Sequence, residues 1–139
     1  MITPDALIQE ARTWVGVPFL HQGRSREGVD CVGLVIVVGR ALGILPRDFE
    51  RTAYGRVPHA GKLLQEIAAH CVSTATACPG SLLVLRWQGD PHHIAICTGA
   101  NLIHANARVG RVVEHGYRHP WPKLTQSVWR MPGVEYVDE

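Results

Sequence analysis

The order of the secondary-structure signals along the chain constrains its fold more than any other feature. Helical periodicity dominates the first half, and after Pro79-Gly80 the sequence changes to short β-prone runs separated by Gly, Pro, Asn and Asp. Helices followed by strands predict an α+β fold with an antiparallel sheet. At 139 residues the chain suits a single domain, 1–139. The strands are predicted over 82–87, 93–98, 101–105, 111–115 and 127–131.

The most informative helical signal is the apolar segment 31–42. Asp30 precedes it at the position of an N-cap, and Gly43 follows it as a stop signal. Its β-branched residues also allow a buried strand, but about a dozen residues is long for a strand. The sequence therefore favours a helix that begins at Cys31. Further helices are predicted over 3–15 and 61–72, and a polar loop over 19–29.

The charge balance excludes several classes of function. Fourteen Lys and Arg residues oppose 12 Asp and Glu residues, and the resulting net charge of +2 is too small to imply a nucleic-acid partner.

No apolar run approaches the roughly 20 residues of a membrane span. The first residues lack the basic start and apolar core of a secretory signal, so we expect synthesis in the cytoplasm. None of the four cysteines forms a C-x-x-C pair, which argues against a zinc finger, and we expect thiols.

Cys31 is the candidate nucleophile. In the first turn of a helix, backbone N–H groups and the helix dipole stabilise a thiolate and lower its pKa. The same N–H groups could bind an oxyanion in acyl transfer. Position alone does not decide between this role and simple packing, because cysteine is among the most buried residue types.

Two histidines are candidates for the base and the orienting residue that a nucleophilic Cys31 requires. Gly99-Ala100 suits a type II′ hairpin, which pairs Thr98 with Asn101. This register places His104 opposite Ala95 and makes His93 its diagonal neighbour on the same face. One imidazole could act as the base toward Cys31 while the other fixes its tautomer. The small side chain of Ala95 leaves room for an approaching helix terminus. A zinc site of Cys31, His93 and His104 is the less favoured alternative, because the spacing of these three residues is irregular.

A series of short motifs resembles the NlpC/P60 family of cysteine peptidases, and the resemblance covers nearly the whole chain. The motifs occur in the order and spacing of the family. They are Gly16-Val-Pro-Phe-Leu-His-Gln-Gly23, Gly28-Val-Asp-Cys-Val-Gly-Leu34, Pro79-Gly80 before an apolar strand, His93-Ile-Ala-Ile96 and Ile103-His-Ala105. The variant of these motifs resembles the single-domain members of the family that are encoded with phage tails and gene transfer agents.

The resemblance implies a papain-like fold with the cysteine helix packed on the antiparallel sheet. It assigns the catalytic cysteine to Cys31, the base to His93 and the third polar residue to His104, and it requires no cofactor or metal. It implies hydrolysis of peptidoglycan stem peptides, commonly at the γ-D-glutamyl–diaminopimelate bond. It also implies phage-like tail proteins as partners and a virion-associated location at the bacterial cell wall.

The substrate-binding residues are less clearly indicated. Phe19 stands where many family members have a tyrosine, so a hydroxyl that could bind substrate or the oxyanion is missing. His21, Arg24 and Arg108 are further candidates, since arginines pair well with the carboxylates of a stem peptide. Solvated loop arginines are the commoner explanation. Two alternative functions remain open: a structural or assembly component of a tail, and an amidase or acyltransferase with the same triad.

Overall fold

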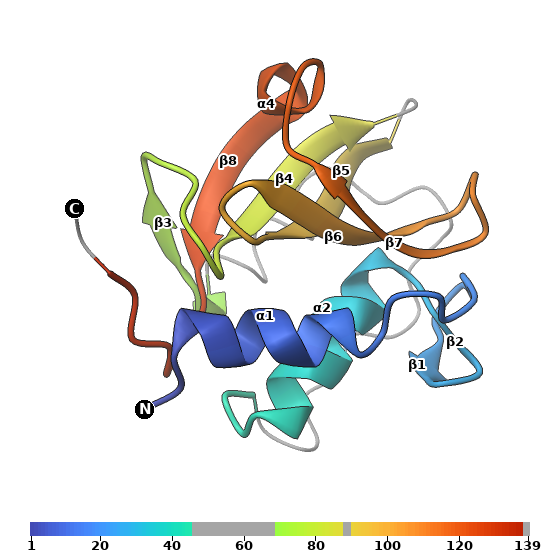
Figure 1. The fold of residues 1–139 in the computed structure, drawn as a ribbon, viewed down its shortest axis with the longest axis horizontal. Coiled ribbons are helices and arrows are strands. Elements are labelled where there is room, and N and C mark those ends of the chain that lie inside the picture. The colour runs from blue at the N-terminus through green and yellow to red at the C-terminus, as the bar shows by residue number, and fades with distance from the viewer. Residues whose placement is uncertain (46–68, 88–89, 138–139) are drawn as a thin grey trace.

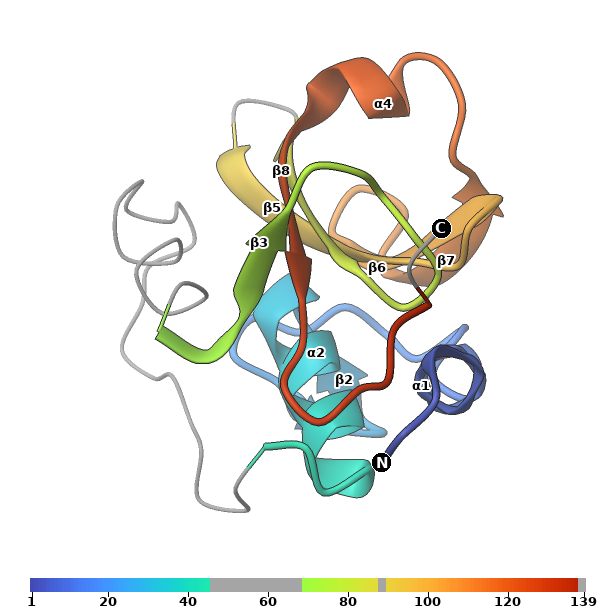
Figure 2. The same cartoon turned by 90° about the vertical axis from the view of Figure 1, so that its left-hand side faces the viewer.

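The fold is a helical layer packed on an antiparallel sheet. A computed structural model describes residues 1–45, 69–87 and 90–137. The helices α1 (Pro4–Arg12) and α2 (Cys31–Ala41) lie on one side of the six-stranded sheet (Figure 1). Figure 2 shows the same layers from the side, with the short helix α4 (Trp121–Leu124) at the far end of the sheet from them. The α+β architecture predicted from the sequence is confirmed.

The helix boundaries follow from the capping residues. The Thr3 side chain accepts a hydrogen bond from the first turn of α1, which ends at Arg12, before the predicted end. The Asp30 side chain caps α2, and Gly43, with φ of +71°, lies just beyond its C-cap. The segment that begins at Cys31 is therefore a helix and not a strand. No helix among the described residues is long and apolar enough to cross a membrane.

The sheet has the strand order β3-β8-β4-β5-β6-β7, and all its described pairings are antiparallel. The edge strand β3 was not predicted. A two-stranded hairpin, β1 with β2, also forms within the predicted loop 19–29. The strands are β1 (Arg24–Ser25), β2 (Gly28–Val29), β3 (Val72–Thr74), β4 (Leu82–Trp87), β5 (Asp90–Cys97), β6 (Asn101–Asn106), β7 (Arg111–Gly116) and β8 (Thr125–Arg130).

One predicted element lies mostly outside the described residues. The helix expected over 61–72 covers residues 61–68, which the structure does not describe, and residues 69–72, which it describes. Val72, the last residue of the prediction, is the first residue of β3 and pairs with Arg130.

The hairpin of β5 and β6 has the predicted register. The Thr98 N–H donates to the Asn101 carbonyl at 2.9 Å, and Ile96 pairs with Ile103. Gly99 has φ of +105°, the sign that the first central position of a type II′ turn requires. Histidines 93 and 104 therefore share one face of the sheet.

Each face of the sheet carries its own apolar cluster. The cluster beneath the helices joins α1 and α2 to the face that includes Ile94, Ile96 and Ile103. The opposite face carries a smaller cluster, against which Tyr117 and Trp121 pack. By strand alternation, His93 and His104 belong to this second face. The members of the second cluster are Leu83, Leu85, Ala95, Cys97, Leu102 and Val128.

Candidate active site

Cys31 is the first residue of α2 and is half-buried. The helix contacts β5 and β6, the strands that carry His93 and His104. Both ribbon views show α2 running away from the sheet, with its N-terminal end beside β6 (Figures 1 and 2). The fold therefore places the thiol in the first turn of a helix, at the end of that helix nearest the two histidine strands, where N–H groups favour a thiolate.

Asp30 organises the chain around the thiol. Its carboxylate is buried, and Oδ1 accepts the Gly33 N–H at 2.7 Å, which caps the helix. Oδ2 accepts the Gln22 N–H at 2.8 Å, and the Arg24 guanidinium lies 3.3 Å from Oδ1. One carboxylate thus fixes the loop before the helix and the helix start relative to each other.

Gly33 allows this loop to approach the helix. A β-carbon at this position would collide with the Gly23 carbonyl and would lie 2.8 Å from the Arg24 guanidinium and 3.0 Å from the Asp30 carboxylate. The Asp-Cys-x-Gly motif therefore has a packing explanation: the aspartate binds the loop, and the glycine makes space for it.

We expect Gly33→Ala to lower the free energy of unfolding by about 1–3 kcal/mol or more, because the Gly23 backbone cannot move aside without breaking the cap. Denaturant unfolding measures the loss. Gly116→Ala is the control, since the atoms that its β-carbon would meet belong to the exposed, movable Arg118 side chain. Equal stability of the two variants would contradict this packing explanation.

Three imidazoles form a continuous hydrogen-bonded row across neighbouring strands. His93 Nε2 lies 2.6 Å from His104 Nδ1, and His104 Nε2 lies 2.9 Å from His115 Nε2. His115 Nδ1 in turn lies 3.2 Å from the Gly116 carbonyl oxygen. The contact between His93 and His104 agrees with the predicted diagonal, whereas His115 was not predicted. We refer to these three residues as the histidine row.

Burial keeps the first two imidazoles of the row neutral. It lowers the pKa of His93 to about 4. Burial also lowers the pKa of His104, to about 2, with further contributions from the neighbouring His93 and His115. At neutral pH His93 is therefore an unprotonated base, which is the form that can accept a proton from a thiol.

The same shifts predict how stability depends on pH. An unfolded histidine titrates near 6.5, so between about pH 6.5 and 4 the unfolded chain binds protons that folded His93 and His104 do not. The contribution of these two histidines to the free energy of unfolding is therefore fully present above pH 6.5. It falls as the pH is lowered, by about 1.4 kcal/mol per pH unit for each such histidine. Urea unfolding at several pH values measures the slope. His93→Gln should reduce the slope.

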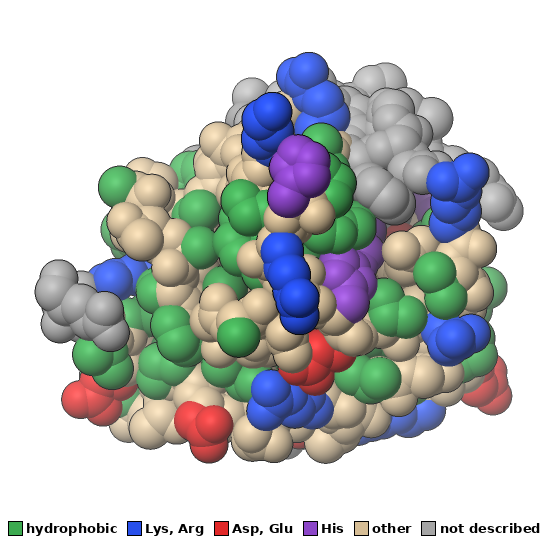
Figure 3. Space-filling model, turned by 45° about the horizontal axis from the view of Figure 1, so that its top comes forward, with side chains coloured by type: hydrophobic (Ala, Val, Ile, Leu, Met, Phe, Trp, Pro, Cys, Tyr) green, Lys and Arg blue, Asp and Glu red, His purple; other side chains and the backbone are tan. Residues whose placement is uncertain are grey.

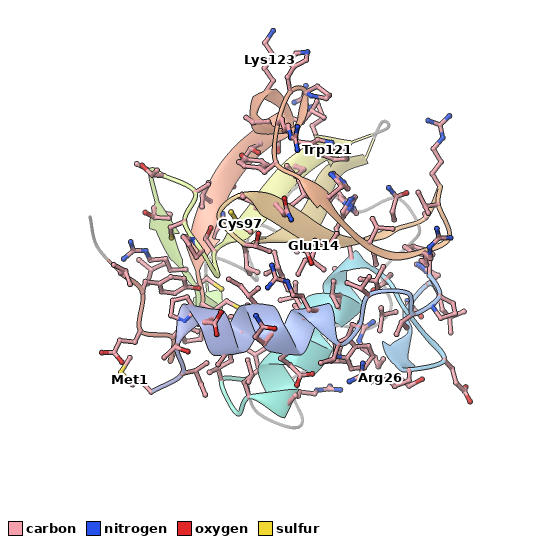
Figure 4. The ribbon with its side chains drawn as sticks, in the orientation of Figure 1. Met1, Arg26, Cys97, Glu114, Trp121 and Lys123 are labelled. Atoms are coloured by element: carbon pink, nitrogen blue, oxygen red, sulfur yellow. The ribbon has the colours of Figure 1, made fainter. Side chains whose placement is uncertain are left out.

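Trp121 covers the row from the side of α4. Its ring lies 5.3 Å from the His104 ring and 4.8 Å from the His115 ring, between centroids. Figure 4 shows Trp121 projecting from α4 toward the sheet. Ala95 belongs to the second cluster, against which Trp121 packs, and α2 packs on the opposite face of the sheet. The helices cover the Ile94 face of β5, and the expectation that a helix terminus approaches above Ala95 stays a prediction.

The predicted substrate-binding residues lie in different surroundings. Phe19 packs, partly buried, against the cluster under the helices, and its N–H donates to the Gly110 carbonyl at 2.8 Å. Arg24 is largely buried beside Asp30. His21 is half-buried and precedes Arg24 in the same loop. Arg108 is exposed on the turn between β6 and β7. Their role toward a substrate stays a prediction.

The surface on the side of α4 is rich in basic groups. Figure 3 shows histidine side chains there, one of them in a recess, bordered by hydrophobic and by Lys or Arg side chains. Within the described residues, no group of three or more metal-ligating side chains is arranged to hold an ion. The nitrogens of the histidine row bind one another instead of converging on one point. The four cysteines, all described, form no disulfide.

Comparison with known sequences identifies one matching family. The sequence model of the NlpC/P60 family matches residues 16–130, which include α2 and every strand of the sheet. A search of curated proteins finds no match.

Several solved structures share the fold. The NlpC/P60 domain of the peptidoglycan hydrolase SagA is 24% identical, with a TM-score of 0.66 over 94% of this chain and 100% of that one. An NlpC/P60 family protein from Bacillus cereus is 22% identical, with a TM-score of 0.69 over 94% of this chain and 40% of its own. The peptidoglycan hydrolase RipB from Mycobacterium tuberculosis is 24% identical, with a TM-score of 0.62 over 96% of this chain and 65% of its own. The chain therefore spans less than two thirds of the last two.

Proposed function

The chain belongs to the NlpC/P60 family, and from this premise we propose that it is a cysteine endopeptidase that hydrolyses the stem peptides of peptidoglycan. The observation that carries the proposal is the placement of Cys31 at the start of α2, which contacts the two strands that present the neutral, buried pair His93 and His104. The peptidoglycan hydrolases SagA and RipB, which have this fold, support the choice of substrate.

The reaction divides into two acyl transfers. The Cys31 sulfur attacks the amide carbonyl as its proton passes to His93, and the carbon–nitrogen bond breaks as that proton passes to the leaving amine. A water molecule then attacks the thioester carbonyl carbon as His93 accepts its proton, the carbon–sulfur bond breaks, that proton returns to the Cys31 sulfur, and the carboxylic acid is released. His104 holds the His93 ring through the 2.6 Å hydrogen bond. No metal or cofactor takes part.

The first turn of α2 supplies the oxyanion donors. The Gly33 N–H is bonded to the Asp30 carboxylate, and the Leu34 N–H to the Asp30 carbonyl. Backbone N–H groups at this helix start, where the helix dipole is positive, are proposed to stabilise the tetrahedral intermediate. Such donors usually provide the largest electrostatic contribution in acyl transfer.

We also propose, from the motif resemblance, that the scissile bond is γ-D-glutamyl–diaminopimelate and that the chain acts at the bacterial cell wall within a phage-like tail or gene transfer agent. A delivery assembly is consistent with the motif variant found here. The exposed Arg108 and the half-buried His21 are candidates for binding the stem-peptide carboxylates.

Digestion of purified diaminopimelate-type peptidoglycan tests the proposal. Mass spectrometry of the soluble products should reveal peptides with a new D-glutamate carboxyl group and a new diaminopimelate amine. A sample alkylated with iodoacetamide should release none. Release of glycan fragments without peptide cleavage, or no release at all, would contradict the proposed activity.

Two outcomes would favour the alternatives. Stoichiometric copurification with tail proteins, together with intact peptidoglycan, indicates a structural or assembly component. Products that carry an added amine in place of water indicate an acyltransferase, because the thioester would then have been attacked by that amine.

A further inference from the structure

His115, the last residue of the histidine row, contacts a backbone carbonyl oxygen, a group that can only accept a hydrogen bond. Its Nδ1 lies 3.2 Å from the Gly116 carbonyl oxygen, and its Nε2 lies 2.9 Å from His104 Nε2. A carbonyl oxygen can only accept a hydrogen bond, so Nδ1 of His115 must carry a proton. A neutral imidazole carries one N–H, and Nε2 of His115 is therefore an acceptor.

This assignment passes along the row one ring at a time. Because His115 Nε2 accepts, His104 Nε2 must donate, and His104 Nδ1 is left unprotonated. Because His104 Nδ1 accepts across 2.6 Å, His93 Nε2 must donate. The remaining nitrogen of His93, Nδ1, is then the unprotonated one, and it is the atom of the row that can take up a proton.

The surroundings of the row preserve this pattern. His104 is fully buried, and its ring meets the rings of His93 and His115 nearly edge-on, at 77° and 78°. Trp121 covers His104 and His115. Burial also lowers the pKa of both His93 and His104, which disfavours a second proton on either ring.

We propose that His115 is a positioning residue that sets the tautomers of His104 and His93, so that Nδ1 of His93 is the proton acceptor for Cys31. The inference rests on the proposed function in one respect, the identity of Cys31 as the nucleophile. The S–H proton moves to His93 Nδ1, the sulfur keeps the electron pair that attacks the carbonyl, and His93 retains its Nε2–H bond to His104.

A wild-type measurement tests the tautomers without any substrate. Long-range ¹H–¹⁵N NMR spectra distinguish protonated from unprotonated imidazole nitrogens. We expect a protonated Nε2 and an unprotonated Nδ1 on His93, and the same pattern on His104. The opposite tautomer on either ring would overturn the proposal, even if the protein hydrolyses peptidoglycan.

Two variants at position 115 test the consequence. His115→Phe keeps a ring against Trp121 but removes the acceptor, and His115→Gln keeps an acceptor. We expect the phenylalanine variant to lose about 10- to 100-fold in kcat with little change in KM, with a mixed His93 tautomer, and the glutamine variant to recover most of the rate. Wild-type kcat and tautomers in His115→Phe would overturn the proposal.

Alkylation of Cys31 provides a readout that separates this inference from the proposed function. His115→Phe should slow Cys31 alkylation at pH 7, measured on the Cys31 peptide by mass spectrometry, and His115→Gln should restore it. If wild type fails to cleave peptidoglycan, the proposed function fails, and the tautomer spectra and alkylation rates still decide the role of His115. Unchanged alkylation in His115→Phe would count against that role.

Discussion

Replacement of Cys31 by alanine should abolish peptidoglycan hydrolysis, because it removes the only atom proposed to form a covalent bond with the substrate. In a well-matched triad, loss of the nucleophile reduces kcat by roughly 10⁶-fold. The half-buried thiol is small, so the fold should be retained. Release of stem-peptide fragments, quantified by mass spectrometry, measures the effect.

Cys71→Ala is the matched control. Cys71 is also half-buried and forms no disulfide, but burial raises the pKa of its thiol to about 11, so it stays protonated at neutral pH. This variant should hydrolyse peptidoglycan at the wild-type rate. Residual activity in Cys31→Ala above that of a mock purification would assign the nucleophile elsewhere.

Replacement of His93 by glutamine should have the next largest effect, a loss of roughly 10²–10⁴-fold in kcat, the range expected for a general base. Glutamine can still donate an amide N–H to His104 Nδ1, which preserves the buried hydrogen bond, but it cannot accept a proton from Cys31. The thermal midpoint of unfolding should therefore change little while hydrolysis falls.

Exposed His119 provides the comparison for this variant, and His119→Gln should behave as wild type. A decrease of less than tenfold in His93→Gln, with the fold intact, would mean that another group takes the proton from the thiol.

Much of this arrangement could be predicted from local sequence signals. Asp30 is the N-cap of α2 and Gly43 lies just beyond its C-cap, so the helix and its first residue follow from capping chemistry. The turn at Gly99 fixes the register of β5 and β6, which brings His93 and His104 onto one face. These features depend on residues close together in the chain.

His115 was missed, although the sequence carries a signal for it. The Asn106 side chain accepts the N–H groups of Arg108 and Val109 at 2.9 and 3.1 Å, and Gly110 has φ of +90°. This turn pairs Asn106 with Arg111, which places His115 opposite Leu102 on the face of His104. The same register argument, applied to the second hairpin, would have found it.

Other features depend on tertiary packing. β5 is apolar on both faces, with Ile94 and Ile96 on one and Ala95 and Cys97 on the other, so alternation cannot tell which face the helices cover. The two-residue strands β1 and β2 are too short to show a period of their own. The contacts of Trp121 with His104 and His115 could not be predicted, because they depend on how α4 packs against the sheet.

The most direct test of the central claim, an activated thiol at the start of α2, is the rate of iodoacetamide alkylation of each cysteine as a function of pH. Cys31, Cys71 and Cys78 are all half-buried, so none of the three is excluded from the reagent by complete burial. We expect Cys31 to react at least about tenfold faster than the other two at pH 6, since helix N–H groups lower a thiol pKa. Parallel loss of hydrolysis should accompany its modification. A Cys31 that reacts no faster than Cys71 would contradict the account.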